Sequence, residues 1–69
     1  MIYKVSYVVR DGTLPGGIRN EQERPSIGAV VRIGPKDYEI IDVYEIMPPR
    51  GEFLYLLATI EPVLEEQSQ

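Results

Sequence analysis

Hydrophobic residues follow a strand-like pattern over the second half of this chain. Residues 26–33, 38–46 and 52–61 are rich in Val, Ile, Leu and Tyr, and they are separated by the connections GPKD and MPPRG. Clusters of Gly, Pro and Asp between such runs are typical of the turns that join β-strands. The pattern predicts an all-β domain built from a small antiparallel, strongly bent sheet of four or five strands.

The first strand is expected at residues 2–10, where neighbouring side chains point to opposite faces. The more apolar of its two faces carries Tyr3, Val5, Tyr7 and Val9. Residues 11–25 then break the alternation with the turn sequences Asp11-Gly12 and Pro15-Gly16-Gly17. We expect a long loop here, attached to the domain by Leu14 and Ile18.

The next two strands are expected at residues 29–33 and 38–46, joined as a hairpin through residues 34–37. The second of them changes phase, because Tyr38 and Ile40 share one face while Ile41 and Val43, around Asp42, fall on the other. A β-bulge or a sharp bend produces such a change. Strand pairing should end at residues 48 and 49, since proline has no N–H to donate.

The last strand is expected at residues 53–61, and it is apolar on both faces. Leu54, Leu56, Ala58 and Ile60 alternate with Phe53, Tyr55, Leu57 and Thr59. Either the loop at residues 11–25 covers the second face, with Leu14 and Ile18 as a lid, or that face remains exposed for an interaction. The buried core is expected to contain Val5, Tyr7, Val31, Ile40, Val43, Leu56 and Ile60.

One strand, a long loop and a meander with short connections resemble an SH3-like small barrel. Residues 27–33, with 38–43 after the turn, are similar to the entry hairpin of KOW-type barrels. The resemblance covers some 20 residues, rests on apolar alternation and transfers no functional residue. It implies a barrel of a kind that binds peptides, RNA or proteins, and such a fold does not by itself select a function.

Length and composition restrict the chemistry further. Sixty-nine residues suffice for one small domain, which we place at residues 1–63, followed by a flexible polar tail at 64–69. The chain has no Cys and no His, so disulfides, thiolate metal sites and imidazole chemistry are excluded. The absence of a leader pattern and of a long apolar segment leads us to expect a cytoplasmic protein without membrane contact.

Catalysis and metal binding are poorly supported by the sequence. No histidine is present to activate a hydroxyl nucleophile, and the carboxylates, among them Glu39, Asp42 and Glu45, are scattered between apolar residues. We therefore expect no enzyme activity, no metal and no cofactor. The net charge of −4 also disfavours nucleic acid, whose binding depends on clustered Lys and Arg.

The remaining candidate is a binding surface. A rigid Pro48-Pro49 step could present Arg50 to a carboxylate or phosphate, although a stiff connection is the simpler interpretation. The candidate binding residues are Arg50, Pro48, Pro49, Phe53, Tyr55, Arg10 and Arg19. The sequence favours a non-enzymatic module that binds a protein, a peptide or a second copy of itself. The alternative is a nucleic-acid or anion-binding module that uses the loop arginines and an exposed tyrosine.

Overall fold

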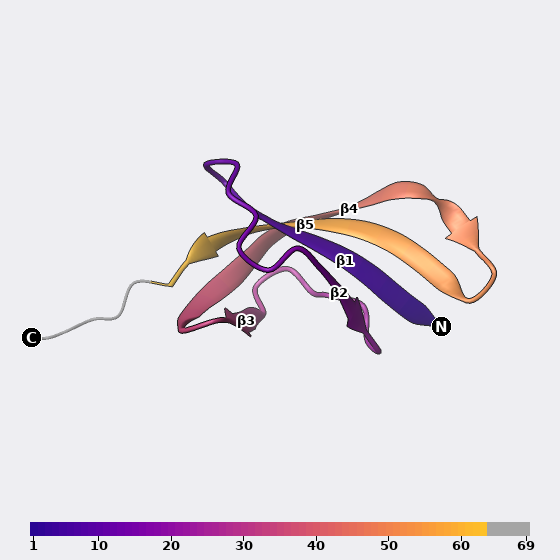
Figure 1. Ribbon diagram of the computed structural model, residues 1–69, viewed down its shortest axis with the longest axis horizontal. Helices are drawn as coiled ribbons and strands as arrows, with labels where there is room; N and C mark the ends of the chain where they lie inside the picture. Colours follow the sequence, from indigo (N-terminus) through magenta and orange to yellow (C-terminus); the bar gives the residue numbers. More distant parts are fainter. Residues whose placement is uncertain (64–69) are drawn as a thin grey trace, which may run out of the picture.

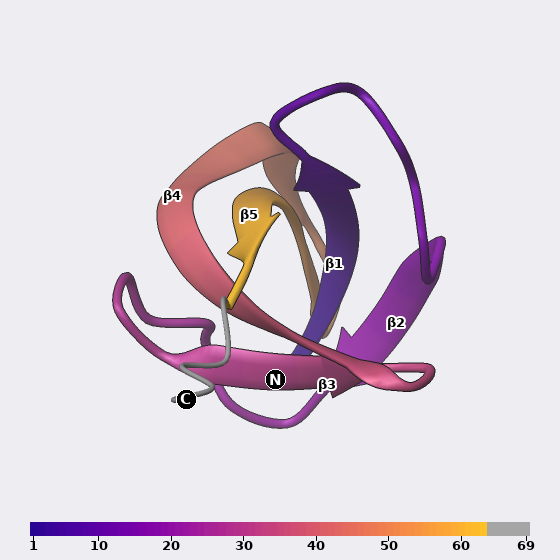
Figure 2. The ribbon, with the colours of Figure 1, turned by 90° about the vertical axis from the view of Figure 1, so that its left-hand side faces the viewer.

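A computed structural model describes residues 1–63, and in this part of the chain all regular structure is β. The strands are β1 (Ile2–Val9), β2 (Ile18–Glu21), β3 (Val30–Ile33), β4 (Lys36–Arg50) and β5 (Phe53–Pro62). They form one sheet in the order β2-β1-β5-β4-β3. The sheet curls into a half-barrel, with β5 in the middle between β1 and β4, and with β2 and β3 at its two edges (Figures 1 and 2). The flexible tail expected at 64–69 lies outside the described residues.

The sheet is mixed, so the prediction of an antiparallel sheet is confirmed only in part. Strand β1 runs parallel to β5, in a continuous register from Ile2 opposite Phe53 to Val9 opposite Ile60. The other three pairs, β1–β2, β3–β4 and β4–β5, are antiparallel. The sequence shows local hairpins but not which strand the first segment joins at long range. In the structure, β1 pairs with the edge of β5 that β4 does not occupy. The strands between β1 and β5 in sequence form the crossover that a parallel pair requires.

The hydrophobic core lies on the inner face of the half-barrel. Its buried residues are Val5, Tyr7, Val9, Ile33, Tyr38, Ile40, Leu54, Leu56, Ala58 and Ile60. Five of the expected core residues are confirmed by this set. The other two, Val31 and Val43, are only partly buried and pack against its margin. The expected inner faces of β1 and β5 are both correct, because alternation in these strands is uninterrupted.

Strand β4 is longer and more bent than expected. It begins at Lys36, which pairs with Ile33, so Gly34 and Pro35 alone form the turn. Gly34 has φ +62°, and the φ of the following proline is fixed near −65°, the combination found in type II′ hairpins. The predicted change of phase is confirmed by a register shift between Ile40 and Asp42.

The two prolines of β4 do not end the strand as predicted. Strand β4 continues to Arg50, which is paired with Phe53, and a register shift separates Met47 from Arg50. Pro48 and Pro49 occupy this irregular stretch, where the ladder does not require their missing N–H groups. The hairpin of β4 and β5 therefore projects as a long arm beyond β3, with β1 paired along the other side of β5 (Figure 1).

The segment at residues 11–25 is not simply a loop. Residues 18–21 form β2, which pairs with β1 from Tyr3 opposite Glu21 to Ser6 opposite Ile18. Leu14 and Ile18 are 63% and 67% exposed, so they neither attach the segment to the core nor form a lid. The expected turn at Asp11-Gly12 is present: Gly12 has φ +95°, and the Val9 N–H donates to the Thr13 carbonyl oxygen.

Strands β2 and β3 approach each other where the half-barrel almost closes. The Arg19 guanidinium of β2 donates to the backbone oxygen of Arg32 in β3 at 3.2 Å. Gly16 lies so close to β3 that a Cβ at this position would be 3.0 Å from the Ile33 side chain. The edge strands β2 and β3 are therefore connected by the Arg19 side chain and by the contact between Gly16 and Ile33, and not by backbone hydrogen bonds between the strands. The barrel thus stays open along this seam.

Candidate functional site

The outer face of the sheet carries an exposed apolar surface. Buried residues alternate with partly exposed ones in β1 and β5, so the partly exposed ones point outward, and pairing with β5 places Tyr44 and Met47 of β4 on the same face. The apolar members of this outer face are Ile2, Val8, Tyr44, Met47, Phe53, Tyr55 and Leu57. Tyr44 and Met47 are 50% and 43% exposed, and the others are partly exposed. Nothing in residues 1–63 packs over them as a second layer, because the expected lid is absent.

Strand register places these residues side by side. Tyr55 lies between Lys4 of β1 and Met47 of β4, and the next outward row contains Leu57 next to Tyr44. The Phe53 and Tyr55 rings are 6.5 Å apart between centroids, with planes inclined by 39°. The Lys4 ammonium lies 5.0 Å from the Phe53 centroid, within the range of a cation–π contact. The apolar surface is therefore continuous between β5 and β4, and Lys4 and Ser6 of β1 border it.

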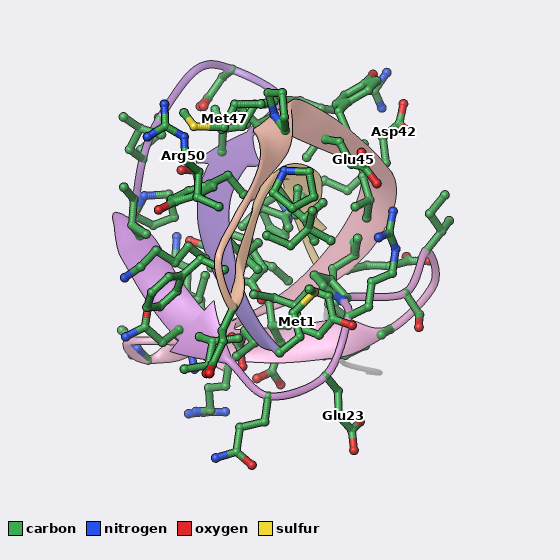
Figure 3. All side chains as sticks on the ribbon, turned by 90° about the vertical axis from the view of Figure 1, so that its right-hand side faces the viewer. Met1, Glu23, Asp42, Glu45, Met47 and Arg50 are labelled. Carbon is green, nitrogen blue, oxygen red and sulfur yellow. The ribbon has the colours of Figure 1, made fainter. Side chains whose placement is uncertain are left out.

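Part of the predicted site is brought together at one end of this surface. Arg50 pairs with Phe53, and Tyr55 follows on the same face of β5. Pro48 and Pro49 lie beside them at the end of β4. Figure 3 shows Arg50 and Met47 next to each other on the arm formed by β4 and β5. Sequence reasoning missed Tyr44 and Met47, because the register shifts in β4 hide which of its residues point outward.

The other predicted arginines are elsewhere. Arg10 follows β1 at the opposite end of the sheet, where it binds Glu61 at 3.2 Å. Arg19 lies at the seam, 3.7 Å from Glu21 and 5.7 Å from the centre of the Tyr7 ring. Two further arginines outside the predicted site are also paired: Arg24 with Glu45, and Arg32 with Asp37. The structure therefore does not assemble a cluster of cations around Arg50.

A small pocket lies inside the seam. It has a volume of about 230 Å³ and is lined by Tyr7, Glu21, Glu23, Arg24, Pro25, Ser26, Ala29, Val31 and Ile40. This is below the range of about 300–1,000 Å³ that is usual for ligand pockets. Its innermost polar groups bind one another, since the Tyr7 hydroxyl donates to Glu21 Oε2 at 2.9 Å. We infer that the role of these residues is structural, and that they help to close the half-barrel.

The ionisable groups offer little for catalysis or metal binding. Burial raises the pKa of Tyr7 to about 12, and the hydrogen bond to Glu21 acts in the same direction, so this phenol stays neutral at physiological pH. Within residues 1–63, no three acidic side chains gather closely enough to hold a metal ion. No helix in this part of the chain is long and apolar enough to span a membrane.

The arm also exposes one strand edge, from the point where β3 stops pairing with β4. This edge is interrupted by the two later register shifts of β4 and by its prolines. At its start the Val43 N–H donates to Asp42 Oδ1 at 3.0 Å, and the Tyr44 hydroxyl donates to Asp42 Oδ2 at 2.6 Å. The bond to Asp42 raises the pKa of Tyr44. Bulges, prolines and charge are the usual protection against edge-to-edge aggregation.

Replacing Asp42 with alanine should therefore promote aggregation through this edge. The change removes a negative charge and leaves the Val43 N–H free to pair with another chain. We expect the rate of thioflavin-positive aggregation to rise at least about twofold. Asp42→Asn is the matched control, since it keeps the side-chain oxygen that accepts from Val43. Equal rates for wild type and Asp42→Ala would show that Asp42 does not protect the edge.

In comparisons with protein-family models, curated proteins and solved structures, the chain matches none of them. The features of the molecule that bear on function are its outer face, the arm and the distribution of charge.

Proposed function

We propose that this protein is a non-enzymatic interaction module that binds a protein partner through the outer face of its sheet. The observation that carries the proposal is the exposed apolar surface that outward residues of β5 form with Tyr44 and Met47 of β4, both of which are close to half exposed. Exposed patches of several hundred Å², bordered by polar residues, commonly mark interaction sites. Aromatic residues and methionine are also enriched in protein interfaces.

The fold supports this proposal without selecting the partner. A small half-barrel with one strongly bent strand is compatible with the SH3-like architecture that the sequence resembles, and we keep that assignment as part of the proposal. Such barrels serve as platforms for binding rather than for one particular chemistry. We also propose a cytoplasmic location, which the lack of cysteine fits.

The alternative, a nucleic-acid or anion-binding module, has less support. Phosphate backbones are bound by groups of cations on one face. Here Arg10, Arg19 and Arg50 lie at three separate places, and the first two are already paired with carboxylates. The remaining support for an anion-binding site is Arg50 alone, which lies beside Phe53 and Tyr55.

The proposal is tested by site-specific photo-crosslinking in the cells that normally produce the protein. A photoreactive phenylalanine analogue replaces Tyr55, which lies in the middle of the outer face. We expect irradiation to give a discrete protein adduct, because a bound partner should lie within contact distance of this side chain. The measurement is the mass of the adduct on a denaturing gel and by mass spectrometry.

The same analogue at position 23 is the control. Figure 3 shows Glu23 on the opposite side of the molecule from Met47 and Arg50. Adducts at position 55 that are absent at position 23 support binding by the outer face. If neither position gives a protein adduct, or if both give the same ones, the proposed function is wrong. An adduct with nucleic acid at position 55 would instead favour the alternative.

A further inference from the structure

The segment that connects β1 to β3 lies outside the hydrophobic core. We call residues 14–27, which include β2, the strap; Figure 2 shows β2 beyond β1 at the rim of the half-barrel. None of its residues is buried, and its large aliphatic side chains are all exposed: Leu14, Ile18 and Ile27. Apolar burial is the dominant favourable term in folding. The strap therefore depends on other contacts to stay on the sheet.

The side-chain contacts of the strap with the rest of the sheet are polar and mostly exposed. They are the pairs Arg19–Arg32, Glu21–Tyr7, Asn20–Lys4 and Arg24–Glu45. The Arg19 guanidinium also lies 5.7 Å from the centre of the Tyr7 ring. Exposed hydrogen bonds and ion pairs add little net stability, because water competes for the same groups. The strap should thus separate from the sheet at a lower free energy than the core strands do.

Strand β1 divides its backbone hydrogen bonds between the strap and β5. The Ile2 N–H donates to the Glu52 oxygen, next to β5, at 2.7 Å, whereas the Tyr7 N–H donates to the Gly17 oxygen of the strap at 3.4 Å. Successive N–H groups of a strand point to opposite sides. The β5-facing amides are therefore Ile2, Lys4, Ser6 and Val8, and the strap-facing amides are Tyr3, Val5 and Tyr7.

Strand β1 does not need the strap to remain in the sheet. Its pairing with β5 runs along the whole of β1, from Ile2 to Val9, whereas β2 covers only part of it. Val5 and Leu56 lie opposite each other in β1 and β5, and both are 0% exposed. Opening of the strap uncovers part of the Tyr7 ring but returns conformational entropy to a long segment. The core of β1, β5 and β4 can therefore persist without the strap.

From the exposure of the strap, its polar contacts and the division of hydrogen bonds in β1, we infer that residues 14–27 open as a unit and uncover the edge of β1, while β1, β5 and β4 stay paired. The open form presents unpaired N–H and C=O groups on β1, the kind of edge to which another extended chain can add. The strap is thus a movable cover for this edge. The inference goes beyond the proposed function, because it concerns a different part of the sheet and its test needs no partner.

Native-state hydrogen exchange of the full-length protein, resolved by residue with NMR, tests the strap. After correction for intrinsic rates, the strap-facing amides should exchange at least about tenfold faster than those of Lys4, Ser6 and Val8. Opening of the strap is sufficient to expose the strap-facing amides, whereas the β5-facing amides require separation of β1 from β5. Alternating protection along one strand is therefore the expected signature.

Arg19→Ala should accelerate exchange of the strap-facing amides at least about threefold and leave the β5-facing amides within about twofold of the wild type. The reason is that Arg19 joins the strap both to β3 and to the Tyr7 ring. Arg10→Ala is the matched control, since it removes an exposed arginine that is paired with Glu61 outside the strap. It should change neither set by more than about twofold. Circular dichroism shows whether each variant remains folded.

The outcomes decide for or against the strap. Equal protection of the two sets overturns the inference, because β1 would then lose both neighbours in a single step. Alternation that Arg19→Ala does not deepen also overturns it, since the opening would not involve the contacts of the strap. Alternation that Arg19→Ala deepens and Arg10→Ala leaves unchanged supports it. Crosslinking at position 55 tests the proposed function separately, so either can fail without the other.

Discussion

Leu56→Ala should lower the free energy of unfolding by about 2–5 kcal/mol, the usual range for truncating a buried leucine. Leu56 is 0% exposed and lies on the inner face of β5, paired with Val5 of β1 on one side and Glu45 of β4 on the other. A domain of this length has a total stability of roughly 3–10 kcal/mol. The substitution therefore removes a large share of it, and chemical denaturation monitored by circular dichroism measures the loss.

The neighbouring residue provides a matched control. Leu57 occupies the next position of the same strand but points outward and is only partly buried. Leu57→Ala should cost at least about 1 kcal/mol less, because it removes less buried surface and leaves no enclosed cavity. Both variants are measured at low concentration, so that self-association does not contribute to stability. Equal losses would contradict the assignment of inner and outer faces in β5.

Leu56→Met keeps the experiment informative if the alanine variant does not fold. Methionine preserves most of the side-chain volume, and such exchanges usually cost less than about 1.5 kcal/mol. A loss from Leu56→Met as large as that from a folded Leu56→Ala would argue against cavity formation as the cause.

The inner faces of the central strands could be predicted from the sequence, and the long-range arrangement could not. Regular alternation in β1 and β5 correctly assigned Val5, Tyr7, Leu56 and Ile60 to the core. In a strand with one buried face, every second residue must point into the core, so the apolar set identifies the inner face. Nothing local specifies that β1 runs parallel to β5. That pairing depends on which sheet edge remains free after the β4–β5 hairpin has formed.

Errors in the sequence interpretation occurred where the backbone departs from regular geometry. Strand β2 was missed because four residues among turn sequences show too little alternation to be recognised. The register shifts of β4 concealed that Tyr44 and Met47 belong to the outer face. Arg50, Phe53 and Tyr55 lie close together, since a short connection joins β4 to β5. Arg10 and Arg19 lie apart from them, because Arg10 follows β1 at the other end of the parallel β1–β5 pair and Arg19 depends on the path of residues 11–17.

The buried hydroxyl of Tyr7 should make the protein lose stability at high pH. Burial raises the pKa of this group to about 12, and Glu21 accepts its proton in a 2.9 Å hydrogen bond. In the unfolded chain a tyrosine titrates near pH 10. Between these two values the unfolded state releases the proton while the folded state retains it, so unfolding becomes more favourable as the pH rises.

The stabilisation is fully present below about pH 10 and is lost by about pH 12. Each pKa unit corresponds to about 1.4 kcal/mol, so the total is roughly 2–3 kcal/mol. Because Tyr7 is 1% exposed, solvent screens this effect little. Denaturant unfolding at intervals from pH 8 to about 12 measures it, the range being set by the two pKa values.

Tyr7→Phe isolates this contribution. At neutral pH it should cost about 1 kcal/mol, the typical value of one lost hydrogen bond. Its stability should then fall less steeply than that of the wild type above pH 10, and the two curves should converge or cross as the pH approaches 12. Tyr44→Phe is the control, since it makes the same change at a half-exposed tyrosine, where solvent weakens the coupling. Parallel curves for wild type and Tyr7→Phe throughout this range would contradict the prediction. They would show that the Tyr7 phenol is accessible to solvent. The seam between β2 and β3 would then be more open than the contacts of Arg19, Glu21 and Gly16 indicate.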